Sequence, residues 1–217
     1  MKLTSTSLYL RKWKKPLWFS FSLLSALSMV LLLSAFQDKS LSPEVYWHWV
    51  EDTDNGLKTI QRTTDFEWSL QYRPAPYIAL QELRTFAPHS RDFEEKVAEL
   101  KGLDYYTLRI RSLQNKEVAA TNAEGEDDFF ARQHYLSSYF AEDLQLVDGQ
   151  DTLPCALFHF ERNYSLAPYN DVLLAFETQA NAEGNKRLLI NSPVLETEPL
   201  VLEITAEAIH NLPDLKL

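Results

Sequence analysis

The pattern of hydrophobic positions divides the chain into one uninterrupted apolar run and a longer part in which apolar and polar residues alternate. The run covers twenty residues, from Leu17 to Phe36, and contains no charged side chain. A helix of this length rises about 30 Å, at roughly 1.5 Å per residue, which matches the hydrocarbon core of a bilayer. Basic residues cluster just before the run, and such residues stay on the cytoplasmic side of a membrane. We therefore predict a cytoplasmic basic segment over residues 1–16, a transmembrane helix or signal anchor over residues 17–36 and an extracytoplasmic domain over residues 37–217.

A cleaved secretory signal is the alternative for the same apolar run. Signal peptides have a shorter apolar core of about 7–15 residues, which ends in small residues spaced as in A-x-A. Cleavage after Ala35 would place Leu33 at the minus-three position, which does not fit that pattern. Trp13 and Trp18 flank the start of the run, as aromatic residues do at a membrane interface. The sequence favours an uncleaved anchor, and both alternatives export the rest of the chain.

Alternation with a period of two predicts strands in the exported part. Residues 57–64 and 66–73 form a predicted hairpin, and the second of these strands has an apolar side chain at every even position. Residues 103–113 repeat this alternation. Further predicted strands, separated by turn residues, cover residues 144–147, 156–164, 172–178, 187–190 and 200–205.

Helical spacing and capping residues predict helices in the first half of the exported part. Ser42-Pro43-Glu44 has the order of a helix start, and Asn55-Gly56 stops this helix because both residues tolerate positive φ. A second predicted helix covers residues 77–86. A third begins at Ser90 and ends before Gly102, and a fourth begins at Glu126. Helices and a hairpin followed by a run of strands indicate a single α+β domain with a mainly antiparallel sheet.

Charge and cysteine content narrow the possible partners. Five of the 21 basic residues precede the apolar run, so 16 basic residues accompany all 31 acidic residues in the exported part, whose formal charge is −15. Such a surface repels phosphate backbones, and we predict that the domain binds no nucleic acid and contacts the membrane only through residues 17–36. Cys155 is the only cysteine, so the fold has no internal disulfide, and we expect its side chain to be buried.

Patterns for metal binding and nucleophilic catalysis are incomplete. Residues 52–56 place oxygen donors before a glycine as a calcium loop does, but Arg62 occupies the position where an EF-hand needs a glutamate. Cys155 and His159 would lie about 13 Å apart on a strand, which exceeds hydrogen-bond reach for a thiol and its base. We predict neither a metal nor a cofactor.

Aromatic residues concentrate between Tyr46 and Tyr77, a segment that holds three of the five tryptophans. Exposed tryptophan and tyrosine side chains can form a platform for a sugar or a peptide, so Trp47, Trp49 and Tyr77 are candidate contact residues. Alternatively, the aromatic residues build the core where the first helix packs on the hairpin. Trp47 and Trp49 point about 200° apart on a helix, which leaves one of them available for binding.

The same segment resembles a group of uncharacterised bacterial exported proteins. The resemblance covers about 30 residues and rests on the segments Tyr46-Trp47-His48-Trp49-Val50-Glu51-Asp52, Asn55-Gly56-Leu57 and Ser69-Leu70-Gln71-Tyr72-Arg73-Pro74. These proteins carry a similar helix, turn and strand end after an export signal, which is often of lipoprotein type. The resemblance implies a location in the bacterial cell envelope and no activity or catalytic residue. This chain lacks the lipoprotein cysteine at the end of its apolar run, where a protein anchor takes the place of the lipid.

Three functions fit these features. The first is a membrane-anchored extracytoplasmic protein that binds a protein partner or takes part in envelope assembly. The second is an envelope hydrolase with a site assembled from distant residues, and the third is a binding module for a small molecule or a glycan. An enzyme predicts a deep pocket where two or more of His48, His134, His159 and the acidic residues converge. A protein-binding module instead predicts an exposed apolar patch with Trp47 or Trp49 and no clustered titratable groups.

Overall fold

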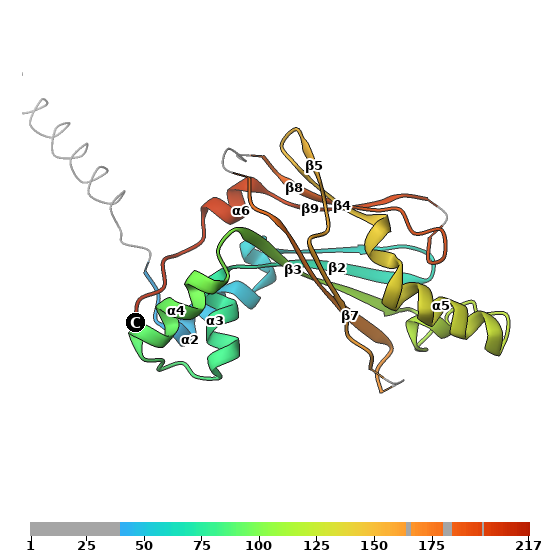
Figure 1. The fold of residues 1–217 in the computed structure, drawn as a ribbon, viewed down its shortest axis with the longest axis horizontal. Coiled ribbons are helices and arrows are strands. Elements are labelled where there is room, and N and C mark those ends of the chain that lie inside the picture. The colour runs from blue at the N-terminus through green and yellow to red at the C-terminus, as the bar shows by residue number, and fades with distance from the viewer. Residues whose placement is uncertain (1–39, 164–165, 180–183, 197) are drawn as a thin grey trace, which may run out of the picture. The chain divides into compact units, whose positions relative to one another are not determined.

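The computed structural model describes residues 40–163, 166–179, 184–196 and 198–217 (Figure 1). The predicted segments 1–16 and 17–36 lie outside these residues. Within the described part of the chain, no helix combines the length and the apolar character needed to cross a bilayer. The helices and strands of residues 40–217 belong to one compact unit.

A five-stranded sheet contains the predicted hairpin. Its order is β1, β2, β3, β7 and β6, and every neighbouring pair is antiparallel. The alternation predicted for residues 66–73 is confirmed, because Phe66, Trp68 and Leu70 are buried. The strands of this sheet are β1 (Lys58–Arg62), β2 (Phe66–Arg73), β3 (Leu103–Ser112), β6 (Leu157–Phe160) and β7 (Tyr169–Glu177).

A second, four-stranded sheet packs on one face of the first. Its strands are also antiparallel, in the order β5, β4, β8 and β9, and β9 lies against β1 and β2. The predicted antiparallel arrangement is therefore confirmed, although the strands divide between two sheets instead of forming one. These strands are β4 (Leu144–Asp148), β5 (Asp151–Pro154), β8 (Lys186–Ile190) and β9 (Leu200–Ile204).

The main hydrophobic core lies between the two sheets. It consists of the inward side chains of both sheets together with Leu136 of α5 (Glu126–Ser138) and Phe140 of the 3-10 helix η4 (Phe140–Asp143). Trp68, Tyr106 and Phe66 are among its largest fully buried side chains. Cys155, between β5 and β6, is half-buried rather than fully buried, and its thiol donates to the carbonyl of Leu157.

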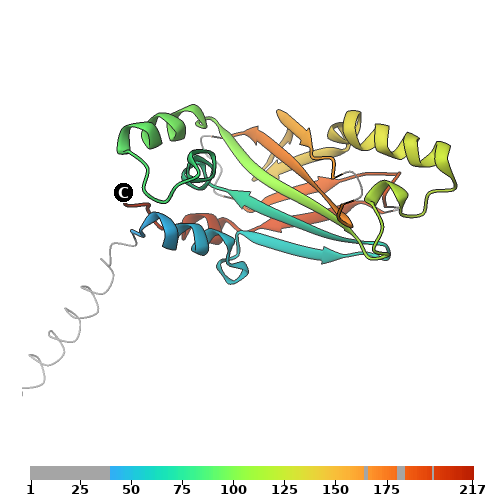
Figure 2. The ribbon, with the colours of Figure 1, turned by 90° about the horizontal axis from the view of Figure 1, so that it is seen from below.

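Three helices gather at one end of the sheets, and α5 lies at the other end (Figures 1 and 2). The three are α2 (Pro43–Glu51), α3 (Ala75–Leu83) and α4 (Ser90–Glu99), which confirms the helices predicted there. A second hydrophobic cluster fills the space between them, and Tyr46, Val50 and Leu80 belong to it. The short helix α6 (Ala206–His210) also contributes to this cluster. The 3-10 helices η2 (Thr53–Asn55) and η3 (Val118–Ala120) complete the described elements.

Candidate functional site

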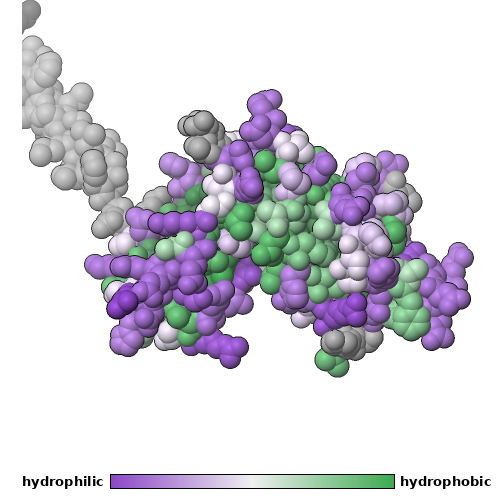
Figure 3. All heavy atoms as spheres, in the orientation of Figure 1, coloured by the Kyte–Doolittle hydropathy of each residue, from purple (hydrophilic) through white to green (hydrophobic). Residues whose placement is uncertain are grey.

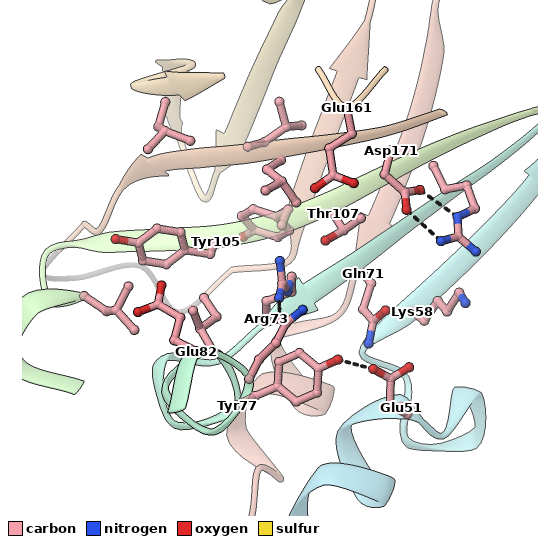
Figure 4. A pocket seen from close by; sticks show the side chains of 18 of the residues that line it. Glu51, Lys58, Gln71, Arg73, Tyr77, Glu82, Tyr105, Thr107, Glu161 and Asp171 are labelled. Atoms are coloured by element: carbon pink, nitrogen blue, oxygen red, sulfur yellow. Dashed lines mark hydrogen bonds and ion pairs between the residues drawn. The ribbon is translucent and has the colours of Figure 1, made fainter. Parts of the chain in front are cut away.

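An open groove of about 750 Å³ crosses the outer face of the five-stranded sheet. It begins at α2 and α3 and continues over β2, β3 and β7 as far as Leu157 of β6 (Figure 4). Both acidic and basic side chains line it, and they come from elements far apart in the sequence. The charged lining residues are Glu51, Lys58, Arg73, Glu82, Arg84, Arg109, Glu161 and Asp171.

The same alternation that builds the core also assembles this polar face. Even positions of β2 and β3 point into the core, so the odd positions point outward into the groove. The antiparallel register then places Gln71 opposite Thr107, and it places Arg109 opposite Asp171. Side chains directly opposite each other on paired strands are close enough to interact, which joins separate strands into one surface.

Arg109 and Asp171 form a fixed ion pair on the sheet face. Arg109 Nε lies 2.6 Å from Asp171 Oδ1, and Arg109 Nη2 lies 2.7 Å from Asp171 Oδ2. The guanidinium also lies over the ring of Tyr169, with Cζ 4.1 Å from the ring centroid. The hydrogen bonds to Asp171 raise the pKa of Arg109. A two-point pair with an aromatic support holds both side chains in one orientation.

At the helical end of the groove, Tyr77 and Arg73 connect α3 to the sheet. Tyr77 Oη donates a hydrogen bond to the carboxylate of Glu51, and Arg73 Nη2 donates one to Oε1 of Gln81 (Figure 4). The guanidinium of Arg73 lies over the Tyr77 ring, with Cζ 5.5 Å from the centroid. Burial and the Glu51 hydrogen bond raise the pKa of Tyr77, so its hydroxyl stays protonated and keeps donating.

Three charged side chains in the groove have no hydrogen bond or ion pair with the described part of the protein. They are Lys58 on β1, Arg84 directly after α3 and Glu161 just after β6. Lys58 and Glu161 lie at opposite sides of the sheet. In Figure 4 the carboxylate of Glu161 points into the groove, toward the side of Thr107. A ligand lying across the strands would meet a free ammonium at one side and a free carboxylate at the other.

The three aromatic residues predicted as contacts lie in or near the helical cluster. Tyr77 lines the groove, although only 5% of its surface is exposed. Trp47 stacks on Tyr77 with ring centroids 4.4 Å apart, and it also contacts the edge of Phe86. Trp49 is partly buried against the same cluster and does not line the groove. The structure therefore brings Trp47 and Tyr77 together and places only Tyr77 at the site.

The histidines considered for catalysis are dispersed over different elements. His48 belongs to α2, and His134 belongs to α5 at the other end of the sheets, where it packs against the ring of Tyr139. His159 lies on β6, and none of the three lines the groove. Within the described residues, no group of three or more histidine, cysteine or acidic side chains is placed to hold a metal ion.

Sequence reasoning did not single out the charged residues of the groove. Arg109 was an outward position of the strand predicted over residues 103–113, whereas Asp171 lay just before the strand predicted over residues 172–178, with 61 residues between the two. Opposite charges at such positions are a signal for a cross-strand pair. The signal becomes specific only when the pairing and register of the strands are known, and these come from the structure.

No protein-family model, no curated protein and no solved structure matches the chain. The resemblance of residues 46–74 to exported bacterial proteins therefore stays a prediction.

Proposed function

We propose that the domain binds a segment of a partner protein in the groove on the five-stranded sheet. We further propose that residues 17–36 anchor the chain in a membrane of the bacterial cell envelope and display the domain outside the cytoplasm. The groove supports the first part of this proposal, and the apolar run with its preceding basic residues supports the second.

The observation that carries the binding function is the balance of charge in the groove. Its lining contains four basic and four acidic side chains, whereas the exported part of the chain has a formal charge of −15. Basic side chains are therefore concentrated at this site relative to the rest of an acidic surface. Complementary charges fix the register of a bound partner and exclude partners with the wrong pattern.

The fixed and free charges have different roles in this proposal. Arg109 and Asp171 hold each other in place, whereas Lys58, Arg84 and Glu161 are free to pair with charges of the ligand. Lys58 lies on β1 and Glu161 directly follows β6, and these outer strands of the five-stranded sheet are about 19 Å apart at roughly 4.8 Å per strand. An extended peptide rises about 3.3 Å per residue, so about six residues would span this distance. The matching segment carries an acidic residue near Lys58 and a basic residue near Glu161.

Apolar side chains next to the charges favour a polypeptide ligand. Leu157 and Leu173 line the groove on the β6 and β7 side, and Leu157 is 43% exposed. Figure 3 shows hydrophobic atoms gathered in the middle of the visible face, over β6 and β7, between more hydrophilic regions at both ends. A peptide supplies charged and apolar side chains together, and partner recognition commonly combines an apolar centre with a polar rim.

Site-specific photo-crosslinking in the native cell tests this function. A benzoylphenylalanine residue at Thr107, in the middle of the groove, should give a discrete adduct with a second protein. The same residue at Val201, which is 44% exposed on β9 and outside the groove, is the positional control and should not give this adduct. Equal adducts from both positions, or no protein adduct from Thr107, would contradict the proposal.

Charge reversal then tests the proposed mode of recognition. The double variant Lys58→Glu with Glu161→Lys should reduce the Thr107 adduct severalfold, because it reverses two of the three free charges without altering the net charge. The matched control is Glu94→Lys with Lys101→Glu, which reverses two exposed charges on and after α4, outside the groove. An adduct that responds equally to both double variants would show that Lys58 and Glu161 do not recognise the partner.

A further inference from the structure

A cluster of charged side chains lies inside the domain, apart from the groove. Lys186 at the start of β8 donates a hydrogen bond to Oδ2 of Asp148, at the end of β4. The same ammonium lies 3.4 Å from Oδ2 of Asp104, on β3. The exposed fractions of the Lys186, Asp148 and Asp104 side chains are 7%, 0% and 12%. None of these three residues lines the groove.

The cluster carries more negative than positive charge when all its groups are ionised. Two carboxylates share one ammonium, which leaves a formal charge of −1 in a region with little contact to water. An uncompensated charge in such surroundings has a large desolvation cost. The hydroxyl of Tyr72 lies 3.5 Å from Asp104 Oδ1 and supplies only a long hydrogen bond.

Two polar atoms beside the charges lack a partner among the described residues. They are Oδ1 of Asp148 and the hydroxyl oxygen of Tyr106, and these residues are only 2% and 1% exposed. Tyr106 interacts electrostatically with both Asp104 and Asp148, so it belongs to the same cluster. Buried polar atoms normally have a hydrogen-bond partner, and both of these oxygens are chemically able to accept a hydrogen bond.

We propose that this cluster is a buried proton-binding site, in which the Asp104 carboxylate takes up one proton from the medium as the pH falls. The proton converts the carboxylate to a carboxylic acid and leaves the pair of Lys186 and Asp148 with no excess charge. It also gives Asp104 a hydroxyl that can donate within the cluster. Because the neutral form suits the buried position, the folded domain becomes more stable in mild acid.

Asp104 is the member that accepts the proton, because Asp148 holds the closer contact to the ammonium. Burial is the main cause that raises the pKa of Asp104, and the charge of Asp148 on β4 adds to it. Lys186 on β8 and the hydroxyl of Tyr72 on β2 act in the opposite direction without cancelling the rise. Tyr106 on β3 interacts electrostatically with the same carboxylate, and Tyr46 on α2 contributes to the raised pKa of Tyr72.

The direction of the pH effect follows from this raised pKa. Between the folded and the unfolded pKa of Asp104, the folded state binds more protons than the unfolded state. The Asp104 contribution to the free energy of unfolding is therefore fully present below the unfolded pKa and is lost as the pH rises through the folded pKa.

Carboxyl NMR titration of the full-length chain in detergent tests the site without a mutation. Through-bond correlations from the Asp104 backbone assign its carboxyl carbon. This carbon should titrate at a higher pH in the folded chain than in the same chain unfolded in urea. If it titrates at or below the pH found in urea, the proposal is wrong.

Stability measurements on variants provide an independent readout. At about pH 8, Asp104→Asn should have a higher Tm than the unmodified chain, because the amide removes the excess charge, and this difference should narrow toward about pH 4. Asp92→Asn, which removes an exposed carboxylate of α4, is the control for the loss of one negative charge elsewhere on the domain. A lower Tm for Asp104→Asn at about pH 8 would show that the ionised carboxylate stabilises the fold, which contradicts the proposal. If Asp104→Asn does not fold, the titration of the unmodified chain still decides.

Discussion

At the scale of single residues, two long basic side chains on the outer face of the sheet are held in place by their neighbours. Arg73 donates to Gln81 and lies on Tyr77, and Arg109 is held between Asp171 and the Tyr169 ring. Such contacts reduce the number of orientations available to a long basic side chain before a ligand arrives. Binding then has a smaller entropic cost, which is how preorganised sites gain affinity.

Replacing Asp171 by Asn should therefore weaken binding more than it weakens the fold. The change removes the carboxylate that positions Arg109, and we expect the Thr107 adduct to fall severalfold. Arg109 is 43% exposed, so the free energy of unfolding should fall by less than about 1 kcal/mol. Crosslinking yield and urea unfolding measure the two effects, with Asp151→Asn as the control. An unchanged adduct would mean that the ion pair does not position Arg109 for the partner.

Trp68 is expected to matter for stability because it is a fully buried residue with a hydrogen bond. Its side chain is 0% exposed, and Nε1 donates to Oε1 of Glu196 at 2.8 Å. Trp68→Phe loses this bond and leaves unfilled volume, so the free energy of unfolding should fall by about 2–3 kcal/mol. Trp49→Phe, at a partly buried position, should cost less than half as much. Urea unfolding measures both losses, with the slope of the free energy of unfolding against urea concentration expected to stay unchanged. Equal losses would show that the hydrogen bond and full burial of Trp68 add nothing to its stabilising effect.

At the scale of elements, the hairpin shows what a sequence pattern can determine. The period-two pattern of residues 66–73 depends only on which side chains avoid water, and β2 (Phe66–Arg73) has these bounds in the structure. Local signals were weaker elsewhere. A turn was predicted after residues 144–147, and Gly149 does lie in a turn, but Asp148 still belongs to β4 and the short strand β5 was not predicted. Its four residues are too few for the alternation to stand out.

The groove depends on information that no single element contains. Arg109 belongs to β3 and Asp171 belongs to β7, and only the pairing of these strands makes them neighbours. A shift of one residue in this pairing would turn one side chain of the pair toward the core. Similarly, Lys186 and the two carboxylates of the buried cluster come from three different strands. Asp104 falls inside a predicted strand, whereas Lys186 and Asp148 lie just outside the strands predicted over residues 187–190 and 144–147, so their sequence positions give no reason to expect a shared site.

Gly56 connects the helical end of the domain to the first sheet, and its conformation can be tested. It has φ 75° after η2, and an added Cβ would lie 3.1 Å from Cβ of Ala208 on α6. Gly56→Ala combines left-handed strain with this close contact, and we expect it to lower the free energy of unfolding by about 2 kcal/mol. Gly102→Ala is the matched control, because Gly102 also has positive φ but nothing lies within 4 Å of the added Cβ. Urea unfolding should show a smaller loss for Gly102→Ala, and equal losses would indicate that α6 adapts to the new methyl group.

At the scale of the whole molecule, the sequence separates a basic segment and an apolar run from the acidic residues 37–217. All 31 acidic residues lie after the run, whereas Arg11, Lys12, Lys14 and Lys15 stand just before it. This asymmetry is the basis of the proposed orientation. Basic residues next to a hydrophobic span stay on the cytoplasmic side, so the opposite flank of the span lies outside the cytoplasm.

Protease protection provides the test of this orientation with the full-length chain. In intact inverted inner-membrane vesicles the domain should be protected from added protease, whereas in spheroplasts the same protease should degrade it. An uncleaved anchor also predicts that the membrane-bound protein keeps its full mass of 25.1 kDa, and a cleaved signal predicts a shorter, released product. Replacing the four basic residues at positions 11, 12, 14 and 15 by serine should reduce the protected fraction, because the charge difference across the span is then largely lost. Degradation of the unmodified chain in inverted vesicles would place the domain in the cytoplasm, and a search for its partner would then have to begin there.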